Sequence, residues 1–206
     1  GFAHDGMSPS SANAVVAATP GLSFVSGTPG TGGFMGFFNV KQAPFDEVPV
    51  RQALMQAIDY KHISETVFQG LRAEAQGLYN TSFDWALTNY TTDVDAAASL
   101  LDNAGWTIGA DGKRSRDGVP LDITMLIYPQ QPDLVPLAND LQAQLHKIGV
   151  GAEIRVVDDI YAALLDAGTD WDLALSSETN VSWGVPDNFM TRYVASTGGR
   201  NYGYKN

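Results

Sequence analysis

The clearest pattern of apolar and polar positions lies in residues 44–70, PFDEVPVRQALMQAIDYKHISETVFQG. Its first half places apolar side chains at i, i+3, i+4, i+7 and i+8, which is one stripe of an α-helix. These positions are Val50, Ala53, Leu54, Ala57 and Ile58. Pro49 suits the first helical turn, where its missing N–H costs nothing. Asp59 can cap a second helix, which turns Ile63, Val67 and Phe68 inward and ends at Gly70. The pattern therefore predicts two short helices that meet at Asp59.

Segments with the apolar pattern of a strand and segments with that of a helix alternate in the second half of the chain. Leu121, Ile123, Met125 and Ile127 alternate as in a strand, a helical stripe runs from Leu134 to Ile148, and Ala152, Ile154 and Val156 form another strand. A further unit follows, with a helix from Asp159 to Ala167 and a strand from Trp171 to Ser176. A strand, a helix and a strand in this order give parallel strands joined by a right-handed crossover. The pattern therefore predicts an α/β fold, with a sheet covered by helices.

The remaining segments carry weaker patterns. A helix over Ser11–Ala18, a strand over Leu22–Ser26 and a strand over Phe37–Val40 are expected before the helix pair. Residues 71–92 are rich in aromatic side chains without periodicity, which indicates a long ordered loop. Asp93 is expected to cap a helix that carries Ala97, Leu100, Leu101 and Ala104 on one face. Gly105 ends this helix, Trp106 folds back on its last turn, and Asp111-Gly112 and Asp117-Gly118 form turns.

Composition and charge exclude several classes of protein. The 206 residues have the apolar and charged content of a globular domain, and they carry 12 basic and 23 acidic side chains, a net charge of −11. Nucleic acid is not an expected partner, because neutralising phosphates requires clustered lysine and arginine. No apolar run reaches the 18 or so residues that span a bilayer. The absence of cysteine excludes disulfides and thiolate chemistry.

Catalytic and cofactor motifs are not found in the sequence. The run 27–36, GTPGTGGFMG, lacks the Gly-Lys-Ser/Thr ending of a phosphate-binding loop and leads into a strand, so a hairpin loop is the favoured interpretation. His4, His62 and His146 share no metal-ligand spacing, and no cofactor or metal is expected. No GxSxG motif is present, and the paired acids Asp158-Asp159 and Asp170/Asp172 are interpreted as caps and edges. An α/β enzyme therefore remains a minor alternative.

The loop at 176–190, SSETNVSWGVPDNFM, holds most of the side chains that suit ligand recognition. In open α/β sheets, ligands gather beyond the carboxyl ends of the strands, and this loop follows a predicted strand. The candidate ligand-binding residues are Trp183, Ser182, Asn180, Glu178 and Asp187, with Ser177 beside them. Trp183 offers a flat apolar face or packs in a capped turn, and both interpretations stay open. Asp187 is favoured as the start of a helix.

Four separated motifs resemble the family 5 extracellular solute-binding proteins of ABC importers, which carry dipeptides, oligopeptides and nickel chelates. Phe38-Asn39 followed by PFDEVPVRQALMQAID resembles the family's "FN" strand and "PFDDxRVRQAxxxAIDR". DVDAAASLLDNAGW, LANDLQAQLHKIGVGAEIRVVD and DWDLAL resemble further family segments, in the family's order. Pro49 and Tyr60 depart from the pattern, at positions expected to be exposed. Most of these residues are structural in the family, so the resemblance implies fold and general role more than ligand.

The resemblance also bears on the candidate loop. In the family, this loop faces a cleft between two lobes and reads "W", a few polar residues, an acid, then "DPxxF", and the acid commonly pairs with the amino terminus of a bound peptide. Here only Gly184 and Val185 separate Trp183 from Pro186, so that acid is missing. Glu178 is a candidate substitute on the other side of Trp183. The Trp-Gly-x-Pro order is similar to the nickel-chelate branch.

The resemblance covers residues 34–206 well and residues 1–33 loosely. It implies a C-terminal lobe of a periplasmic-binding-protein-like (type II) fold, excised from a larger two-lobed protein, with residues 1–206 as one lobe. The implied partners are a peptide or small-molecule ligand, the missing N-terminal lobe of the same chain, and the permease subunits in the membrane. The implied location is extracytoplasmic, either periplasmic or as a cell-surface lipoprotein. A receptor or chaperone-like interaction module on the same fold is a further alternative.

Overall fold

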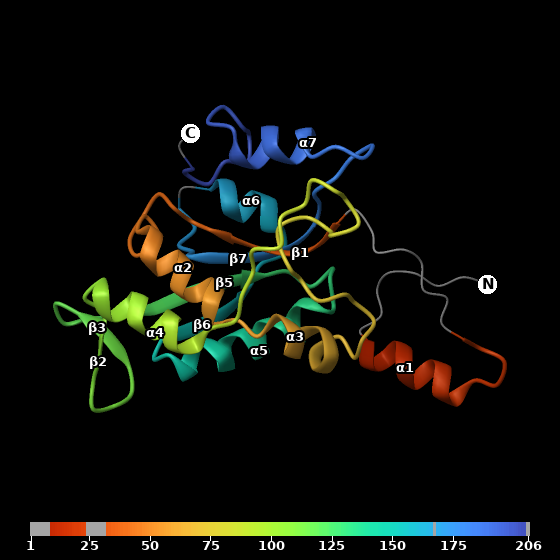
Figure 1. Cartoon of the computed structure of the whole chain (residues 1–206), viewed down its shortest axis with the longest axis horizontal. Helices are drawn as coiled ribbons and strands as arrows, with labels where there is room; N and C mark the ends of the chain where they lie inside the picture. Colours follow the sequence, from red (N-terminus) through yellow and green to blue (C-terminus); the bar gives the residue numbers. More distant parts are fainter. Residues whose placement is uncertain (1–8, 24–31, 167, 205–206) are drawn as a thin grey trace.

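A four-stranded mixed sheet lies between two layers of helices in the computed structural model, which describes residues 9–23, 32–166 and 168–204 (Figure 1). The strand order is β1-β7-β5-β6, where β1 is Gly32–Phe38, β5 is Asp122–Ile127, β6 is Gly151–Val156 and β7 is Leu173–Thr179. β5 is parallel to both β6 and β7, whereas β1 is antiparallel to β7. The predicted α/β fold and both parallel pairings are confirmed.

The larger core lies between the sheet and the helices α2 (Val48–Ala57), α4 (Val94–Asn103) and α5 (Leu134–Lys147). A second core on the other face packs the sheet against α6 (Ile160–Leu165), the one-turn helix α7 (Asp187–Phe189) and the π-helical turn η2 (Met190–Val194). Residues Ile123–Ile127 of β5 are therefore buried on both faces instead of alternating with exposed positions. α1 (Pro9–Ala18) extends from one end of the molecule, away from the sheet (Figure 1).

The helix pair predicted over residues 44–70 is confirmed, with differences in its second half. Val50, Ala53, Leu54 and Ala57 form the buried face of α2, and Asp59 accepts a hydrogen bond from the backbone N–H of His62, 2.8 Å away, as a cap. After the single α-helical turn of α3 (Tyr60–His62) the chain widens into the π-helical turn η1 (Ile63–Val67). Ile58 already lies outside α2 in an extended conformation.

Tyr60 is not exposed, contrary to the sequence-based expectation. Its ring stacks on Tyr90 with 5.2 Å between centroids, and its hydroxyl donates to the carbonyl of Met55 at 2.9 Å. The loop 71–92 lies over α3 and supplies Tyr90, so the apolar ring is covered by a segment distant in sequence. Pro49 is exposed as expected.

α4 follows the prediction closely. Asp93 accepts a hydrogen bond from the N–H of Ala96, and Gly105 ends the helix with a φ of +85°, which the absence of a Cβ makes favourable. Trp106 then folds back, and its N–H donates to the carbonyl of Leu101 at 2.9 Å. The two Asp-Gly turns join β2 (Thr107–Ile108), β3 (Arg114–Arg116) and β4 (Val119–Pro120) into a small separate sheet.

Three predicted boundaries are wrong in the structure. β1 begins at Gly32, five residues before the expected strand, because this segment pairs with β7 along its whole length. A Cβ at Gly32 would come within 2.3 Å of the carbonyl oxygen of Glu178, so a glycine is needed there. β7 runs from Leu173 to Thr179 instead of 171–176, which places Ser177 and Glu178 in the strand. α6 ends at Leu165.

The N-terminal predictions fall partly outside the described residues. The expected helix is confirmed as α1, although it begins at Pro9. Of the strand expected over Leu22–Ser26, the described residues Leu22 and Ser23 are not in a strand, and 24–26 lie outside the described ranges. Residues 27–31 of the expected hairpin loop and His4 also lie outside them. Among the helices that the structure describes, none is long and apolar enough to cross a bilayer.

Asp172 forms a buried link between strands. One carboxylate oxygen accepts the backbone N–H of Thr124 on β5 at 2.8 Å, and the other accepts the side-chain amide of Gln42 at 3.4 Å. Burial, which penalises the charged form, raises the pKa of this carboxyl above its ordinary value, although the hydrogen bonds act in the opposite direction. The acid predicted as an edge residue is therefore part of the interior of the sheet.

We expect Asp172→Asn to change how stability depends on pH. A carboxyl group whose pKa is raised in the folded state stabilises the fold most at low pH. This stabilisation is lost as the pH rises from the pKa of the unfolded chain, near 4, through the raised pKa of the folded state. The unfolding free energy of the original chain minus that of the variant should therefore increase as the pH falls from 7 towards 4. Urea unfolding at several pH values measures it. A difference independent of pH would contradict this account.

Candidate functional site

The candidate loop lies at the edge of the sheet where the parallel strands end. The carboxyl ends of β5 and β7 meet at this edge, and the amino end of the antiparallel β1 lies beside them, with Gly32 opposite Thr179. Tyr128 follows β5, and its hydroxyl accepts a hydrogen bond from the backbone N–H of Ser177 on β7 at 3.2 Å. Residues 180–186 continue directly from β7. The topology therefore places the loop where α/β sheets bind ligands.

Trp183 lies at the tip of a two-residue turn. Ser182 and Val185 exchange two backbone hydrogen bonds of 3.0 and 3.1 Å, and the two residues between them have φ values of +56° (Trp183) and +81° (Gly184). This pair of positive φ values is that of a type I′ turn. Glycine adopts it readily, whereas a bulky residue in the left-handed region is uncommon and strained. The turn holds a tryptophan at a position that favours asparagine, aspartate or glycine.

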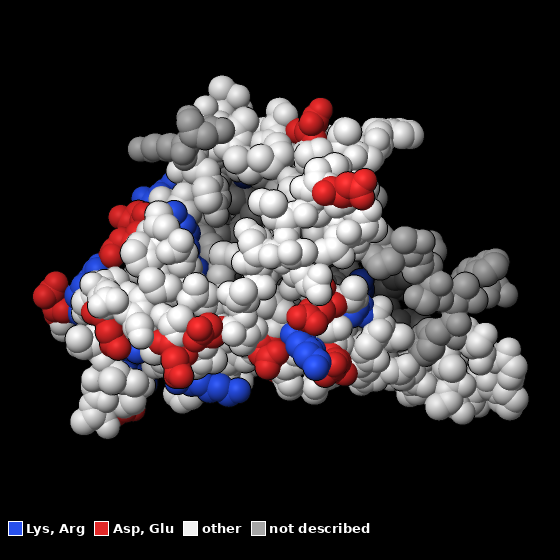
Figure 2. Space-filling view, viewed as in Figure 1, with Lys and Arg blue, Asp and Glu red and all other residues white. Residues whose placement is uncertain are grey.

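The side chain of Trp183 is fully exposed, with a relative accessibility of 101%. It is therefore not the packed tryptophan that one interpretation of the sequence predicted. Figure 2 shows that most charged side chains of the face in view lie along its left side and its lower half, over α2, α3, α4 and α5, with fewer, acidic groups over the part near α7. A large apolar ring that projects from the surface is suited to stack on a flat or apolar partner.

Glu178 is held inside the protein. Its side chain is 5% exposed, and one carboxylate oxygen accepts hydrogen bonds from the hydroxyls of Tyr161 (2.7 Å) and Ser176 (2.9 Å). The other oxygen lies 3.8 Å from the guanidinium of Arg200. That guanidinium lies 3.6 Å from the centroid of the Tyr161 ring and donates to the hydroxyl of Tyr193 at 2.8 Å. Burial, reinforced by the hydrogen bond to Glu178, raises the pKa of the Tyr161 hydroxyl.

The other candidate residues divide into an inner and an outer group. Asn180 is buried, and its amide donates to the backbone carbonyl of Leu78 in the loop 71–92. Ser182 is half-buried at the base of the turn, and Asp187 is exposed in the first turn of α7, whose N-cap is Pro186. The structure thus brings Trp183, Ser182 and Asp187 to the outer side of the loop, whereas Glu178 and Asn180 bind segments of the protein itself.

The loop 71–92 is a part of the site that the sequence did not assign. Besides the bond from Asn180, its Tyr79 ring meets Phe189 of α7 edge-on at 6.4 Å, and Tyr79 also packs edge-on against Trp85 at 5.0 Å. Arg200 was missed as well, because a partner 22 positions from Glu178 leaves no local signal. The clustering of aromatic residues in 71–92 was the available sign that this loop packs on another element.

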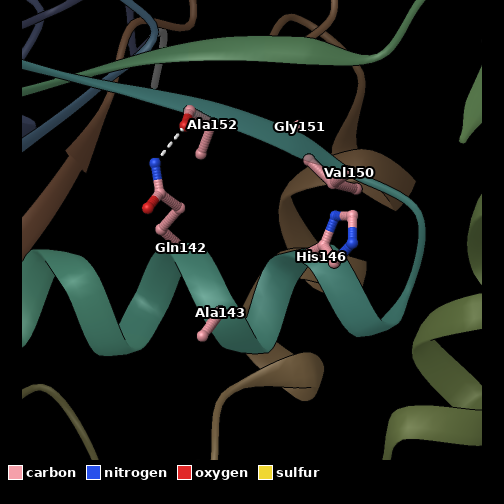
Figure 3. Close-up of a pocket in the computed structure, with 6 residues that line it drawn as sticks. All are labelled: Gln142, Ala143, His146, Val150, Gly151 and Ala152. Atoms are coloured by element: carbon pink, nitrogen blue, oxygen red, sulfur yellow. Dashed lines mark hydrogen bonds between the residues drawn. The ribbon is translucent and has the colours of Figure 1, made fainter.

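Two surface hollows lie away from the turn. One, of about 340 Å³, lies between α5 and β6, where Gln142 donates to the carbonyl of Ala152 at 2.6 Å and His146 and Val150 line the far end (Figure 3). The other, of about 530 Å³, lies beside η1 and α5. His62 pairs with Asp140 on α5 at 3.0 Å. Among the residues that the structure describes, no group of three or more histidine, cysteine or acidic side chains could hold a metal ion.

Comparison with known proteins gives consistent matches. The sequence model of the bacterial extracellular solute-binding proteins, family 5 Middle, matches residues 5–201. The dipeptide-binding protein of Escherichia coli (strain K12) is 29% identical over 176 residues, which are 80% of this chain and 30% of that protein. The nickel-binding periplasmic protein of the same organism is 28% identical over 153 residues, 72% of this chain and 28% of that protein. The chain thus spans less than a third of these relatives.

Solved structures show the same fold. A nickel ABC transporter protein of Bacillus halodurans superposes with a TM-score of 0.79 at 24% identity, covering 93% of this chain and 40% of that one. The oligopeptide-binding protein AppA of Bacillus subtilis, in complex with a nonapeptide, gives a TM-score of 0.73 at 22% identity, covering 85% and 36%. The predicted type II periplasmic-binding-protein-like α/β fold is confirmed. The chain belongs to the family 5 bacterial extracellular solute-binding proteins.

Proposed function

We propose that this chain forms one lobe of the solute-binding component of an ABC importer. In this role the protein captures a peptide or similar small solute between two lobes and delivers it to permease subunits in the membrane. Membership of the solute-binding family supports the proposal. The observation that carries it is Trp183, an exposed ring in a left-handed backbone conformation at the strand-end edge. A strained, exposed aromatic residue stabilises nothing within the lobe, and this is expected of a recognition residue.

The five candidate residues take two roles in this proposal. Trp183 contacts the solute through its ring, and Ser182 and Asp187 offer polar groups beside it. Glu178 and Asn180 position the turn. Glu178 binds Tyr161 of α6 and lies beside Arg200 of the C-terminal segment, and Asn180 binds the loop 71–92. Affinity then depends on closure of the two lobes, since the solute contacts both only in the closed state. The protein would act outside the cytoplasm, in the periplasm or as a cell-surface lipoprotein.

The solute class has two candidates, a peptide and a nickel chelate. The relatives include proteins named for both ligands. The turn has no acid between Trp183 and Pro186, and Glu178 is occupied by internal partners, so Asp187 is the acid of the candidate set that an ammonium group could reach on the outer side. This feature favours solutes recognised through a flat or apolar surface. Mass spectrometry of molecules that co-purify with the full-length protein, with metal analysis of the same sample, distinguishes the candidates.

Trp183→Asn tests the proposal. Asn-Gly is the preferred pair for a type I′ turn, so this variant should keep the turn and raise the unfolding free energy by about 0.5 kcal/mol. Loss of the ring should weaken binding of the co-purified solute by about 10-fold or more, because a central aromatic contact contributes roughly 1.5–2 kcal/mol. Calorimetry on the full-length protein measures the affinity, with Ile108→Ala as a control on another exposed apolar residue, in the β2–β3–β4 sheet. An affinity within twofold of the original would refute the role of Trp183.

A further inference from the structure

Arg72 occupies the same strand-end edge as the candidate loop, on the face of the sheet that α5 covers. It is the second residue of the loop 71–92, two positions after Gly70, which ends the second helix. Its partners are Asp133, in the segment that joins β5 to α5, and the ring of Phe34, which lies on β1 opposite Ser177. Three segments distant in sequence therefore meet at this arginine.

The guanidinium of Arg72 is held from two sides. Its Nε and Nη2 both donate to one carboxylate oxygen of Asp133, at 3.1 and 2.6 Å. Its Cζ lies 4.7 Å from the centroid of Phe34 and 5.7 Å from that of Phe68, and these two rings stack at 5.6 Å. The hydroxyl of Ser64 donates to the Arg72 carbonyl at 2.7 Å, which also fixes the backbone. An arginine held in this way loses little conformational entropy when it binds a further group.

Asp133 holds the arginine instead of capping its own helix. It is the residue before α5, where an aspartate normally accepts a backbone N–H from the first turn, but it makes no such bond. The third residue of α5 is Pro136, which has no N–H to offer. The Asp133 side chain is 5% exposed, and its second oxygen is buried with no hydrogen-bond partner within residues 9–23, 32–166 and 168–204. The carboxylate of Asp133 therefore binds Arg72 and does not cap α5.

The guanidinium of Arg72 has N–H groups that bind no other described residue. Of the five N–H groups of a guanidinium, two bind Asp133, and Nη1 makes no hydrogen bond within the described part of the chain. The Arg72 side chain is 46% exposed. A fixed, half-exposed guanidinium with free planar donors matches the geometry of a carboxylate. We propose that Arg72, positioned by Asp133 and Phe34, is a subsite that receives a carboxylate group of the solute; its use in transport rests on the function proposed above.

Acetate tests the subsite directly, without knowledge of the natural solute. The Nε–Hε resonance of Arg72 and the backbone amides of Phe34 and Asp133 are followed by NMR while sodium acetate replaces sodium chloride at constant ionic strength. We expect a saturable shift of these signals at millimolar acetate, and none with neutral acetamide. Arg155 is the matched control, because its side chain is 40% exposed and also lies beside an acid, Glu153, at 3.6 Å. Its signal should not saturate.

The variants separate this inference from the proposed function. Arg72→Gln should abolish the acetate-induced shifts of the Phe34 and Asp133 amides, whereas Trp183→Asn should leave them unchanged. A linear response at Arg72 equal to that of Arg155, an equal response to acetamide, or amide shifts that persist in Arg72→Gln would each overturn the subsite. Saturable acetate binding together with unaltered solute affinity in Trp183→Asn would instead overturn the proposed role of the turn and leave the Arg72 site standing.

Discussion

Replacement of Arg114 by methionine should lower the free energy of unfolding by about 3 kcal/mol, although no ligand contact is involved. The side chain of Arg114 is 3% exposed. Its Nε donates to the carbonyl of Ile148 at the end of α5 (2.7 Å), and its Nη1 donates to the carbonyl of Trp106 and to Asp102 of α4 (both 2.5 Å). Methionine retains much of the apolar stem but leaves two buried carbonyls without a donor, and each costs about 1–3 kcal/mol.

Urea unfolding followed by circular dichroism measures this loss. Arg155→Met is the matched control, because the side chain of Arg155 is 40% exposed, its pair with Glu153 spans 3.6 Å and its bond to the carbonyl of Asp170 (3.1 Å) is exposed, so the variant should change stability by less than about 1 kcal/mol. Equal effects of the two substitutions would show that the Arg114 contacts contribute no more than a surface ion pair. The expected difference follows from burial, since both residues are arginines beside an acid.

Local rules predicted the elements whose signals lie within a few residues. The stripes of α2, α4 and α5 are buried as their spacing indicates, and Asp59, Asp93 and Asp159 each accept backbone N–H groups as caps. The parallel pairing of β5 with β6 and β7 follows from the order of strands and helices. These features are encoded locally, because hydrophobic period and helix caps depend on neighbours in the chain.

Strand boundaries and buried charges depend on contacts between distant segments, and the sequence did not predict them. β1 extends back to Gly32 because β7 pairs with it through Thr179, and a glycine-rich run gives no sign of such a partner. Glu178 was assigned to a ligand-facing loop, and the same pairing places it in a strand. Its side chain then points towards α6, on the face opposite to the core formed by α2, α4 and α5. A shift of a few residues in one boundary thus changes the inferred role of an acid.

The sequence predicted where the candidate loop lies in the fold, at the edge where the parallel strands end. Trp183 was proposed there for its flat apolar face, and the structure leaves that side chain fully exposed, but its role in binding stays a prediction. Its left-handed backbone was not foreseen, because Trp-Gly is not a typical sequence for this turn. Arg72 was also not singled out, since its partners Phe34 and Asp133 are 38 and 61 positions away. A lone arginine in a loop resembles any solvated charge until these partners are known.

Arg200→Met should also cost about 3 kcal/mol of unfolding free energy, because it leaves the buried carboxylate of Glu178 without its cation. The guanidinium also lies against Tyr161 and binds the Tyr193 hydroxyl, so the substitution loosens the contact between β7, α6 and the C-terminal segment. The uncompensated charge of Glu178, more than lost packing, should account for most of this cost. Urea unfolding near neutral pH provides the measurement.

The double variant Glu178→Gln with Arg200→Met separates charge from packing. A neutral glutamine still accepts the hydrogen bonds of Tyr161 and Ser176 through its carbonyl oxygen, and it needs no cation. The double variant should therefore be more stable than Arg200→Met alone, with a coupling energy of about 1–2 kcal/mol. Additive losses would mean that Arg200 acts through packing on the tyrosine rings. A favourable coupling would identify Glu178 as an internal acid whose charge is already balanced within the lobe, and a solute with an ammonium group would then have to find its partner elsewhere.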